Sequence, residues 1–173
     1  AEEGAGARPE PLASRPGGDG GGAPEPPPGV SCRTGVPAGG GPAGAALVLA
    51  AHGTLVDPPR PYETGERETR ALAGRIMDAL AEQFPVAVLG WLNHRFGGTW
   101  TSPAVGEALA WARARGCRAV VYYPFGFLAD NAESQLEGRL ALRDAGFDRA
   151  WHLPCLNDSR ALASAIAATA RAR

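Results

Sequence analysis

The chain has 173 residues, of which 45% are hydrophobic, and a formal net charge of −1 at pH 7. This length predicts one globular domain with room for a tail, and no apolar run approaches the roughly 18 residues that a transmembrane helix needs. The balanced charge gives no electrostatic reason to expect nucleic acid or an anionic membrane as a partner.

The first 45 residues are rich in Gly and Pro and contain no aromatic residue. Such a segment cannot bury enough apolar surface to offset the entropy lost on ordering, so we predict disorder over residues 1–45. It contains GGGPAG (39–44), which formally matches the dinucleotide motif GxGxxG. That motif must follow a strand and open a helix, whereas this copy precedes the first predicted strand, so we expect no nucleotide there.

Over residues 46–173, apolar runs typical of buried parallel strands alternate with helical patterns. We predict strands over residues 46–51, 86–92, 119–125 and 150–156. We predict helices over residues 66–84, 103–116, 131–145 and 159–171. This alternation predicts an α/β domain with a three-layer αβα architecture around a four-stranded parallel sheet.

Two of the predicted helices carry specific local signals. The first is expected to bury Leu72, Ile76 and Leu80 on one face and to stop at Pro85. The second is expected to be capped by Thr101 or Ser102, with Pro103 in its first turn and Gly116 at its end.

The three cysteines, Cys32, Cys117 and Cys155, lie far apart and form neither a CxxC pair nor a zinc-finger spacing. We therefore expect a reduced intracellular chain and a cytoplasmic location. The first residue is Ala rather than Met, so we expect a fragment, a processed product or a trimmed record.

Ligands of open parallel sheets bind at the carboxyl ends of the strands. Polar residues follow each predicted strand at this edge: His52; then Asn93, His94 and Arg95; then Asp130 and Glu133; then Asn157 and Asp158. The remaining histidine, His152, falls inside the last predicted strand and is expected to be a core or face residue.

Several of these residues have a purely structural alternative. Asp130 and Glu133 have the spacing of a helix cap, although capping does not explain a further acid, Glu137, one turn on. The segment 157–159 fits a helix cap better than a ligand contact. His94 is equally compatible with loop packing and with a site, whereas His52 at a strand end beside Gly53 is the least easily explained by packing.

An imidazole that faces one or two carboxylates can hold Fe, Co, Zn or Ni, or can move protons near neutral pH. So few ligands indicate an open site through which a metal passes rather than stays. Hydrolase and NTPase interpretations lack support because the sequence has no GxSxG, P-loop or HExxH motif.

Five segments occur in an order and at a spacing that a known family shares: AAHG (50–53), PYETGERET (61–69), NHRFGGTWTSP (93–103), GFLADNAES (126–134) and LPCLNDS (153–159). Together they resemble the carboxy-terminal half of the ferrochelatases, enzymes that insert ferrous iron, Fe(2+), into a porphyrin in heme biosynthesis. The resemblance covers nearly all of the predicted domain and implies a chelatase-like half-domain.

The resemblance implies a role for five residues. His52 matches the histidine over the porphyrin face, which binds metal or takes a pyrrole proton, and Glu133 matches its partner carboxylate. Glu137 matches the next acid of a line that conducts protons or metal. Arg95 and Trp100 lie in the loop that is near the macrocycle in family members.

The chain also departs from the family pattern. Asn131 stands where many members have His, Ala141 where they have a third acid, and Arg60 where Asp usually precedes Pro-Tyr. The amino-terminal half-domain, which forms the other wall of the cleft in two-domain members, has no counterpart in this sequence. A cysteine-bearing extension of the kind that holds an iron–sulfur cluster in some members has none either.

The resemblance therefore implies a lyase-class metal chelatase with Fe(2+) and a porphyrin as substrates, no permanently bound cofactor and no iron–sulfur cluster. A homodimer or a separate chain would supply the second half of the cleft. Two alternatives stay open: a homodimeric cobalt or nickel chelatase of a related tetrapyrrole, and a truncated, non-catalytic porphyrin-binding domain. Protoporphyrin and coproporphyrin are not distinguished.

Overall fold

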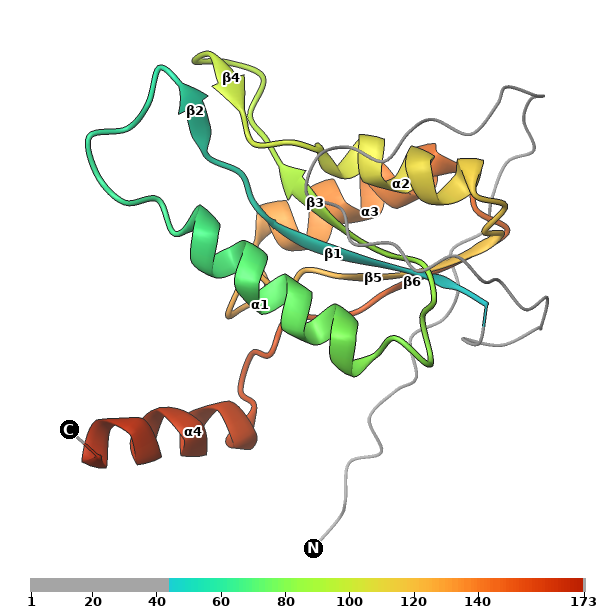
Figure 1. The fold of residues 1–173 in the computed structure, drawn as a ribbon. Coiled ribbons are helices and arrows are strands. Elements are labelled where there is room, and N and C mark those ends of the chain that lie inside the picture. Colours follow the sequence, from blue (N-terminus) through green and yellow to red (C-terminus); the bar gives the residue numbers. More distant parts are fainter. Residues whose placement is uncertain (1–43, 173) are drawn as a thin grey trace, which may run out of the picture.

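The computed structural model describes residues 44–172, which form an α/β fold around a central sheet (Figure 1). The predicted disordered segment lies outside the described residues, apart from Gly44 and Ala45. The same holds for Cys32 and for the GGGPAG segment up to residue 43.

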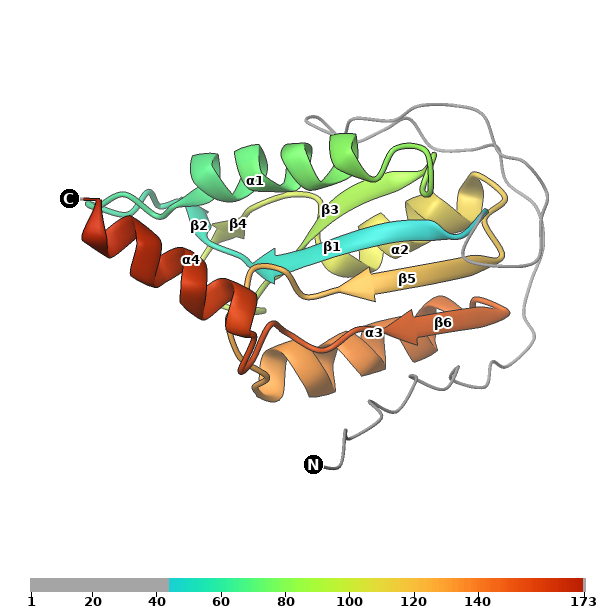
Figure 2. The ribbon, with the colours of Figure 1, turned by 90° about the horizontal axis from the view of Figure 1, so that it is seen from below.

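The central sheet has four parallel strands in the order β3–β1–β5–β6, which Figure 2 shows side by side. The strands are β1 (Ala46–His52), β3 (Ala87–Leu92), β5 (Ala119–Tyr123) and β6 (Arg149–His152). β1 is buried up to its last residue, His52, because both faces of a parallel sheet are covered. The predicted four-stranded parallel sheet is confirmed.

Helices cover both faces of this sheet (Figure 1). α1 (Glu66–Ala79) packs on one face, while α2 (Val105–Ala114) and α3 (Gly138–Ala145) pack on the other. The two cores alternate along β1, with Leu47 and Leu49 on the α1 side and Val48 and Ala50 on the other. The predicted three-layer αβα architecture is confirmed.

α1 is shorter than predicted, and Ala73 is buried in place of Leu72. It ends at Ala79, and Leu80 is its C-cap. Ile76 and Leu80 pack against the core as expected, but Leu72 is 50% exposed and Ala73 is buried instead. The smaller side chain allows the helix to lie close to the sheet.

α2 begins later than predicted, so the proposed Thr101 or Ser102 cap is wrong. Its N-cap is Ala104, whose N–H donates to the Glu107 carboxylate at 2.7 Å. Thr101 is unavailable because it belongs to the preceding loop, where its N–H donates to the Thr54 carbonyl at 2.9 Å. Gly116 adopts a positive φ of 82° just after the helix, as its predicted place at the helix end requires.

Two predicted strands end early because prolines follow. β5 stops at Tyr123 before Pro124, and β6 stops at His152, two residues before Pro154. Proline has no N–H to donate to a neighbouring strand. The segments after β5 and β6 therefore leave the sheet as loops at its carboxyl edge.

A second, two-stranded antiparallel sheet was not predicted from the sequence. It pairs β2 (Leu55–Asp57) with β4 (Thr99–Trp100). β2 follows β1 by two residues, and β4 lies in the loop that leaves β3. This small sheet therefore connects the two loops that extend from neighbouring strands of the central sheet.

The last helix, α4 (Arg160–Arg171), stands apart from the sheet in Figure 1, and none of its residues is buried. Its predicted cap is confirmed, because the Ser159 hydroxyl accepts the Leu162 N–H at 3.3 Å. Within residues 44–172, no helix is both long and apolar enough to cross a bilayer.

Candidate functional site

Three side chains converge at the carboxyl edge of the sheet: His52, His94 and Glu133. The Nε2 of His52 lies 3.5 Å from Oε2 of Glu133, and the Nε2 of His94 lies 3.9 Å from Oε1 of the same carboxylate. One ligand atom from each residue lies within 4.8 Å of the other two. We call these three residues the triad. The structure thus brings together His52 and Glu133, the pair that the sequence placed at one edge.

The register of the sheet explains why the two histidines meet. His52, the last residue of β1, lies opposite Leu92, the last residue of β3. His94 follows Leu92 by two residues, so it emerges beside His52. His94 therefore lies beside the other two side chains and also packs in its loop against Trp100.

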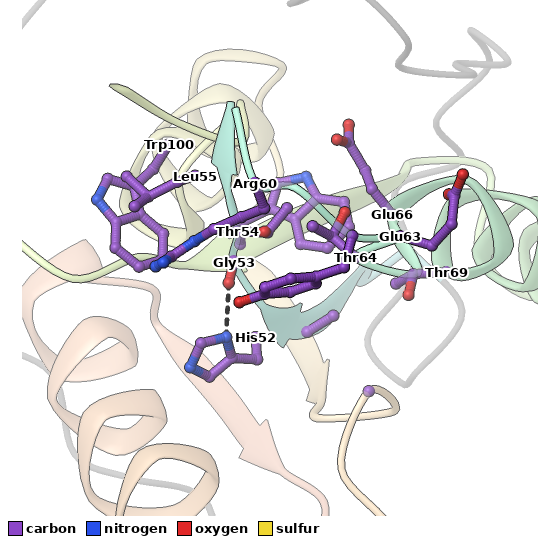
Figure 3. A pocket seen from close by; sticks show the side chains of 14 residues that line it. His52, Gly53, Thr54, Leu55, Arg60, Glu63, Thr64, Glu66, Thr69 and Trp100 are labelled. Carbon is purple, nitrogen blue, oxygen red and sulfur yellow. Dashed lines mark hydrogen bonds between the residues drawn. The ribbon is translucent and has the colours of Figure 1, made fainter. Parts of the chain in front are cut away.

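The orientation of His52 is determined by its neighbour. Its Nδ1 lies 2.6 Å from the Gly53 carbonyl (Figure 3). A carbonyl only accepts, so Nδ1 carries a proton, and Nε2 is the nitrogen that faces the Glu133 carboxylate. A hydrogen bond of this kind fixes the tautomer of metal-binding histidines. Gly53 is required here, because a Cβ would overlap the Asn93 amide oxygen.

Aromatic contacts hold His94 in the loop after β3. Its ring meets that of His52 edge-on at a centroid distance of 5.4 Å, and that of Trp100 at 5.3 Å. The Trp100 indole N–H donates to the Phe96 carbonyl at 2.9 Å. Trp100, which the family resemblance places near the macrocycle, therefore also positions a triad residue.

Glu133 lies in a wide helical turn, η1 (Ala132–Glu137), that follows the loop after β5. The N-cap is Asn131, whose side chain accepts the Ser134 N–H at 2.8 Å. The Ser134 hydroxyl accepts the Asn131 N–H at 2.9 Å. Asn131 occupies a position where many family members have His, and here it acts as a helix cap.

The capping interpretation of Asp130 is wrong, because this residue connects two loops instead. Its carboxylate accepts the Cys155 N–H at 2.8 Å and the Asn157 side-chain amide at 3.0 Å. The Asp130 N–H in turn donates to the Asn157 side chain at 2.8 Å. These bonds, the Cys155 amide first, hold the pKa of Asp130 below its ordinary value. No local sequence signal predicted this pairing between the loops after β5 and β6.

The triad lies between two cavities. One, of about 400 Å³, is lined by His52 and Trp100 together with Arg60 and Tyr62 (Figure 3). The other, of about 530 Å³, is lined by His94 on one side and by Glu137 on the other. Arg95, Ala141 and Asp144 also line the second cavity. Glu137 thus lies outside the triad but opens into the cavity beside it.

Large apolar side chains are exposed on the segments that carry the triad. Phe96 is 83% exposed, Leu128 67% and Leu136 59%. These side chains offer apolar surface on three segments near the triad. The triad side chains themselves are accessible, with exposed fractions of 45% for His52, 52% for His94 and 28% for Glu133.

Two polar residues of this region are buried away from the cavities. His152 is 6% exposed, which confirms that it is a core residue. Burial raises the pKa of the Cys155 thiol, which lies 3.8 Å from the Pro124 carbonyl and stays protonated near neutral pH. Neither residue belongs to the triad.

Chemically, the triad is a set of two imidazoles and one carboxylate with space between them. Two ligands about 2.1 Å from one ion at the tetrahedral angle lie about 3.4 Å apart. The 3.5 Å between His52 and Glu133 matches that separation, and the His94 Nε2 lies 3.9 Å from the other oxygen of the same carboxylate. Such a set suits borderline divalent ions such as Fe, Co, Ni or Zn.

Comparison with known proteins identifies the family of the chain. The family model described as Ferrochelatase matches residues 37–173. A comparison with curated proteins gives no match. The family match confirms the resemblance inferred from the five sequence segments, and the chain belongs to the ferrochelatase family.

Proposed function

We propose that this chain inserts Fe(2+) into a porphyrin in heme biosynthesis, with His52 and Glu133 at the reacting centre. Membership of the ferrochelatase family supports a metal chelatase in general. The observation that carries the finer assignment is the His52–Glu133 pair, 3.5 Å apart, in which Nε2 of His52 faces the carboxylate while the Gly53 carbonyl holds Nδ1.

The reaction exchanges a divalent cation for the protons of two pyrrole N–H groups. A neutral imidazole and a carboxylate are both bases that accept such protons near neutral pH. Because the Gly53 carbonyl holds the His52 Nδ1 proton, the Nε2 atom is the one that takes a pyrrole proton or contacts the metal. Glu137, in the cavity beside the triad, then passes protons towards solvent.

His94 adds a third ligand for the metal substrate. It shares the Glu133 carboxylate with His52. Three ligands hold a divalent ion better than two, while leaving coordination positions open for the incoming pyrrole nitrogens. The triad therefore brings the metal to the macrocycle.

The macrocycle would lie against the exposed apolar side chains beside the triad. Phe96 and Leu128 offer apolar surface for an aromatic ring system. Trp100 and Arg95 line the two cavities, and Arg95 offers a guanidinium for the carboxylates that porphyrins carry. Because both histidines are about half exposed, a second copy or a separate chain is proposed to form the other wall of the cleft.

An anaerobic insertion assay tests the proposal. The full chain is given Fe(2+) with protoporphyrin or coproporphyrin, and loss of the free-base absorption bands is followed. His52→Ala and Glu133→Gln are each expected to lower the rate at least about a hundredfold. Glu82→Gln, an exposed acid after α1 and far in sequence from the triad, is the matched control. A full insertion rate in His52→Ala would refute the assignment.

A further inference from the structure

The turn that carries Glu133 is wider than an α-helical turn. In η1 (Ala132–Glu137) the pattern is that of a π-helix. The Gly138 N–H donates to the carbonyls of Gln135 and Glu133, three and five residues back. In an α-helix it would donate to Ser134, four residues back. The Ser134 carbonyl is therefore left without its usual helical partner.

A buried imidazole supplies the missing partner. The Nε2 of His152, in β6, lies 2.8 Å from the Ser134 carbonyl oxygen. Because a carbonyl only accepts, Nε2 carries the proton and donates it. His152 is 6% exposed and Ser134 is fully buried, so water does not compete for this bond.

The imidazole has no other role in hydrogen bonding within residues 44–172. Its Nδ1 atom is buried without a hydrogen-bond partner, and so is the hydroxyl of Tyr122, on which the ring stacks at a centroid distance of 5.1 Å. A buried polar ring usually satisfies both of its nitrogens. The one bond that His152 does make is the one that the wide turn requires.

The residue after the turn, Gly138, leaves room for the His152 ring because it has no side chain. A Cβ on Gly138 would lie 2.9 Å from the His152 Nε2 and 2.9 Å from Cε1 of Tyr122. These distances are too short for ordinary contacts. Gly138 thus gives the imidazole access to the Ser134 carbonyl, and the ring, the glycine and the π turn form one arrangement.

We propose that His152 is a positioning residue for the triad: its hydrogen bond to Ser134 maintains the π turn and so directs Glu133 towards His52 and His94. Without that bond, the Ser134 carbonyl recovers its α-helical partner, Gly138. The hydrogen bond of the Gly138 N–H then spans four residues instead of five. As a result, Glu133 rotates by about 100° about the helix axis relative to α3. The carboxylate leaves the two imidazoles, although neither His152 nor Ser134 touches the metal or the macrocycle.

This inference rests on the proposed role of the triad, and a metal titration tests it. Co(2+) is added to the full chain, and binding is followed by calorimetry and by visible absorption. His152→Asn places its amide near the position of Nδ1 and cannot reach Ser134, whereas the longer His152→Gln places an N–H near the position of Nε2. We expect Co(2+) to bind at least about tenfold more weakly to the Asn variant, and close to the wild-type affinity to be restored in the Gln variant.

Tyr122→Phe is the matched control, because it keeps the stacked ring and removes only a hydroxyl that has no partner. It is expected to leave Co(2+) affinity unchanged. Circular dichroism and a thermal midpoint establish that each variant is folded. If the Asn variant does not fold, the comparison of Gln with wild type decides, since a Gln variant that folds and binds Co(2+) tenfold more weakly contradicts the proposal.

A structural measurement separates failure of this inference from failure of the proposed function. Crystal structures of the wild type and the Asn variant show which carbonyl accepts the Gly138 N–H. A change from Glu133 to Ser134 supports the positioning role even if no Co(2+) binds to the wild type, a result that would instead count against the triad as a metal site. A folded Asn variant that keeps the π turn and the wild-type affinity overturns the inference.

Discussion

The two oxygens of the Glu133 carboxylate face different histidines. Oε1 lies 3.9 Å from the Nε2 of His94, and Oε2 lies 3.5 Å from the Nε2 of His52. Each imidazole thus has its own oxygen, and the three side chains enclose a space without filling it. The arrangement arises because the loops after β1, β3 and β5 all leave the same edge of the sheet.

Removal of His94 is expected to weaken metal binding more than removal of an acid outside the triad. In His94→Ala, Co(2+) loses one of three ligands, so we expect its affinity to fall at least about tenfold, which corresponds to about 1.4 kcal/mol. The visible spectrum of the bound Co(2+) should also change. Glu82→Gln is the control, because Glu82 is exposed after α1 and lines neither of the two cavities. Equal weakening in both variants would contradict a specific role for His94 as a metal ligand.

The Asp130 carboxylate is expected to stabilise the fold by joining the loops after β5 and β6. Asp130→Asn replaces one of the two accepting oxygens with a donor, which faces either the Cys155 N–H or the Asn157 side-chain amide. We expect the free energy of unfolding to fall by about 1 kcal/mol, measured by urea denaturation at neutral pH. Asp148→Asn, an exposed acid at the opposite edge of the sheet, should cost less.

Because of the same carboxylate, we expect the free energy of unfolding to fall in acid. The pKa of Asp130 is lowered in the folded chain from an ordinary value of 3.8. The contribution of the ionised Asp130 carboxylate to the free energy of unfolding is therefore complete above pH 3.8. It is lost as the pH falls through the lowered pKa of the folded state. The wild type and Asp130→Asn should differ in unfolding free energy at pH 6 and converge in strong acid. A difference that persists unchanged at low pH would contradict this account.

The burial of His152 leads us to expect a second pH dependence of the free energy of unfolding, at milder acidity. Burial lowers its pKa from the ordinary value of 6.5, with Arg139 also lowering it and with the Ser134 carbonyl and Asp130 acting in the opposite sense. Below pH 6.5 the unfolded chain binds the proton more readily, so stability is complete above 6.5 and declines as the pH falls below it. Urea midpoints between pH 5 and 8 measure this, and His152→Gln should lose that part of the dependence. Superimposable profiles would show that His152 does not contribute.

Close packing between β3 and α2 makes one glycine hard to replace. A Cβ on Gly90 would lie 2.8 Å from the Val105 Cα, a backbone atom that cannot move alone. We expect Gly90→Ala to destabilise the chain by about 1–3 kcal/mol. Gly74→Ala in α1, where a Cβ meets nothing within 4 Å, is the matched control and should stabilise by up to about 1 kcal/mol. Equal effects on the urea midpoint would contradict this packing argument.

Much of the fold was predictable from local signals. The apolar runs of β1, β3 and β5 specify buried strands, and the Ser159 cap specifies the start of α4. The ends of elements were less predictable. At Thr101 a capping side chain is bonded within a loop instead, and Ala73 replaces Leu72 on the buried face of α1. Local preferences of this size are overridden by packing and by long-range hydrogen bonds.

By itself, the sequence determined the parallel αβα architecture and the edge at which polar residues gather, and its resemblance to the ferrochelatases implied that His52 and Glu133 form a pair. The architecture and the edge depend on periodicity and on the common direction of parallel strands, which can be inferred from local patterns in the chain. Only the tertiary structure decided that His94 lies beside the pair, that Asp130 bonds to Asn157, and that His152 bonds to the Ser134 carbonyl in a π turn. Each of these depends on contacts between residues far apart in the chain, whose geometry is set when the sheet and its helices pack together.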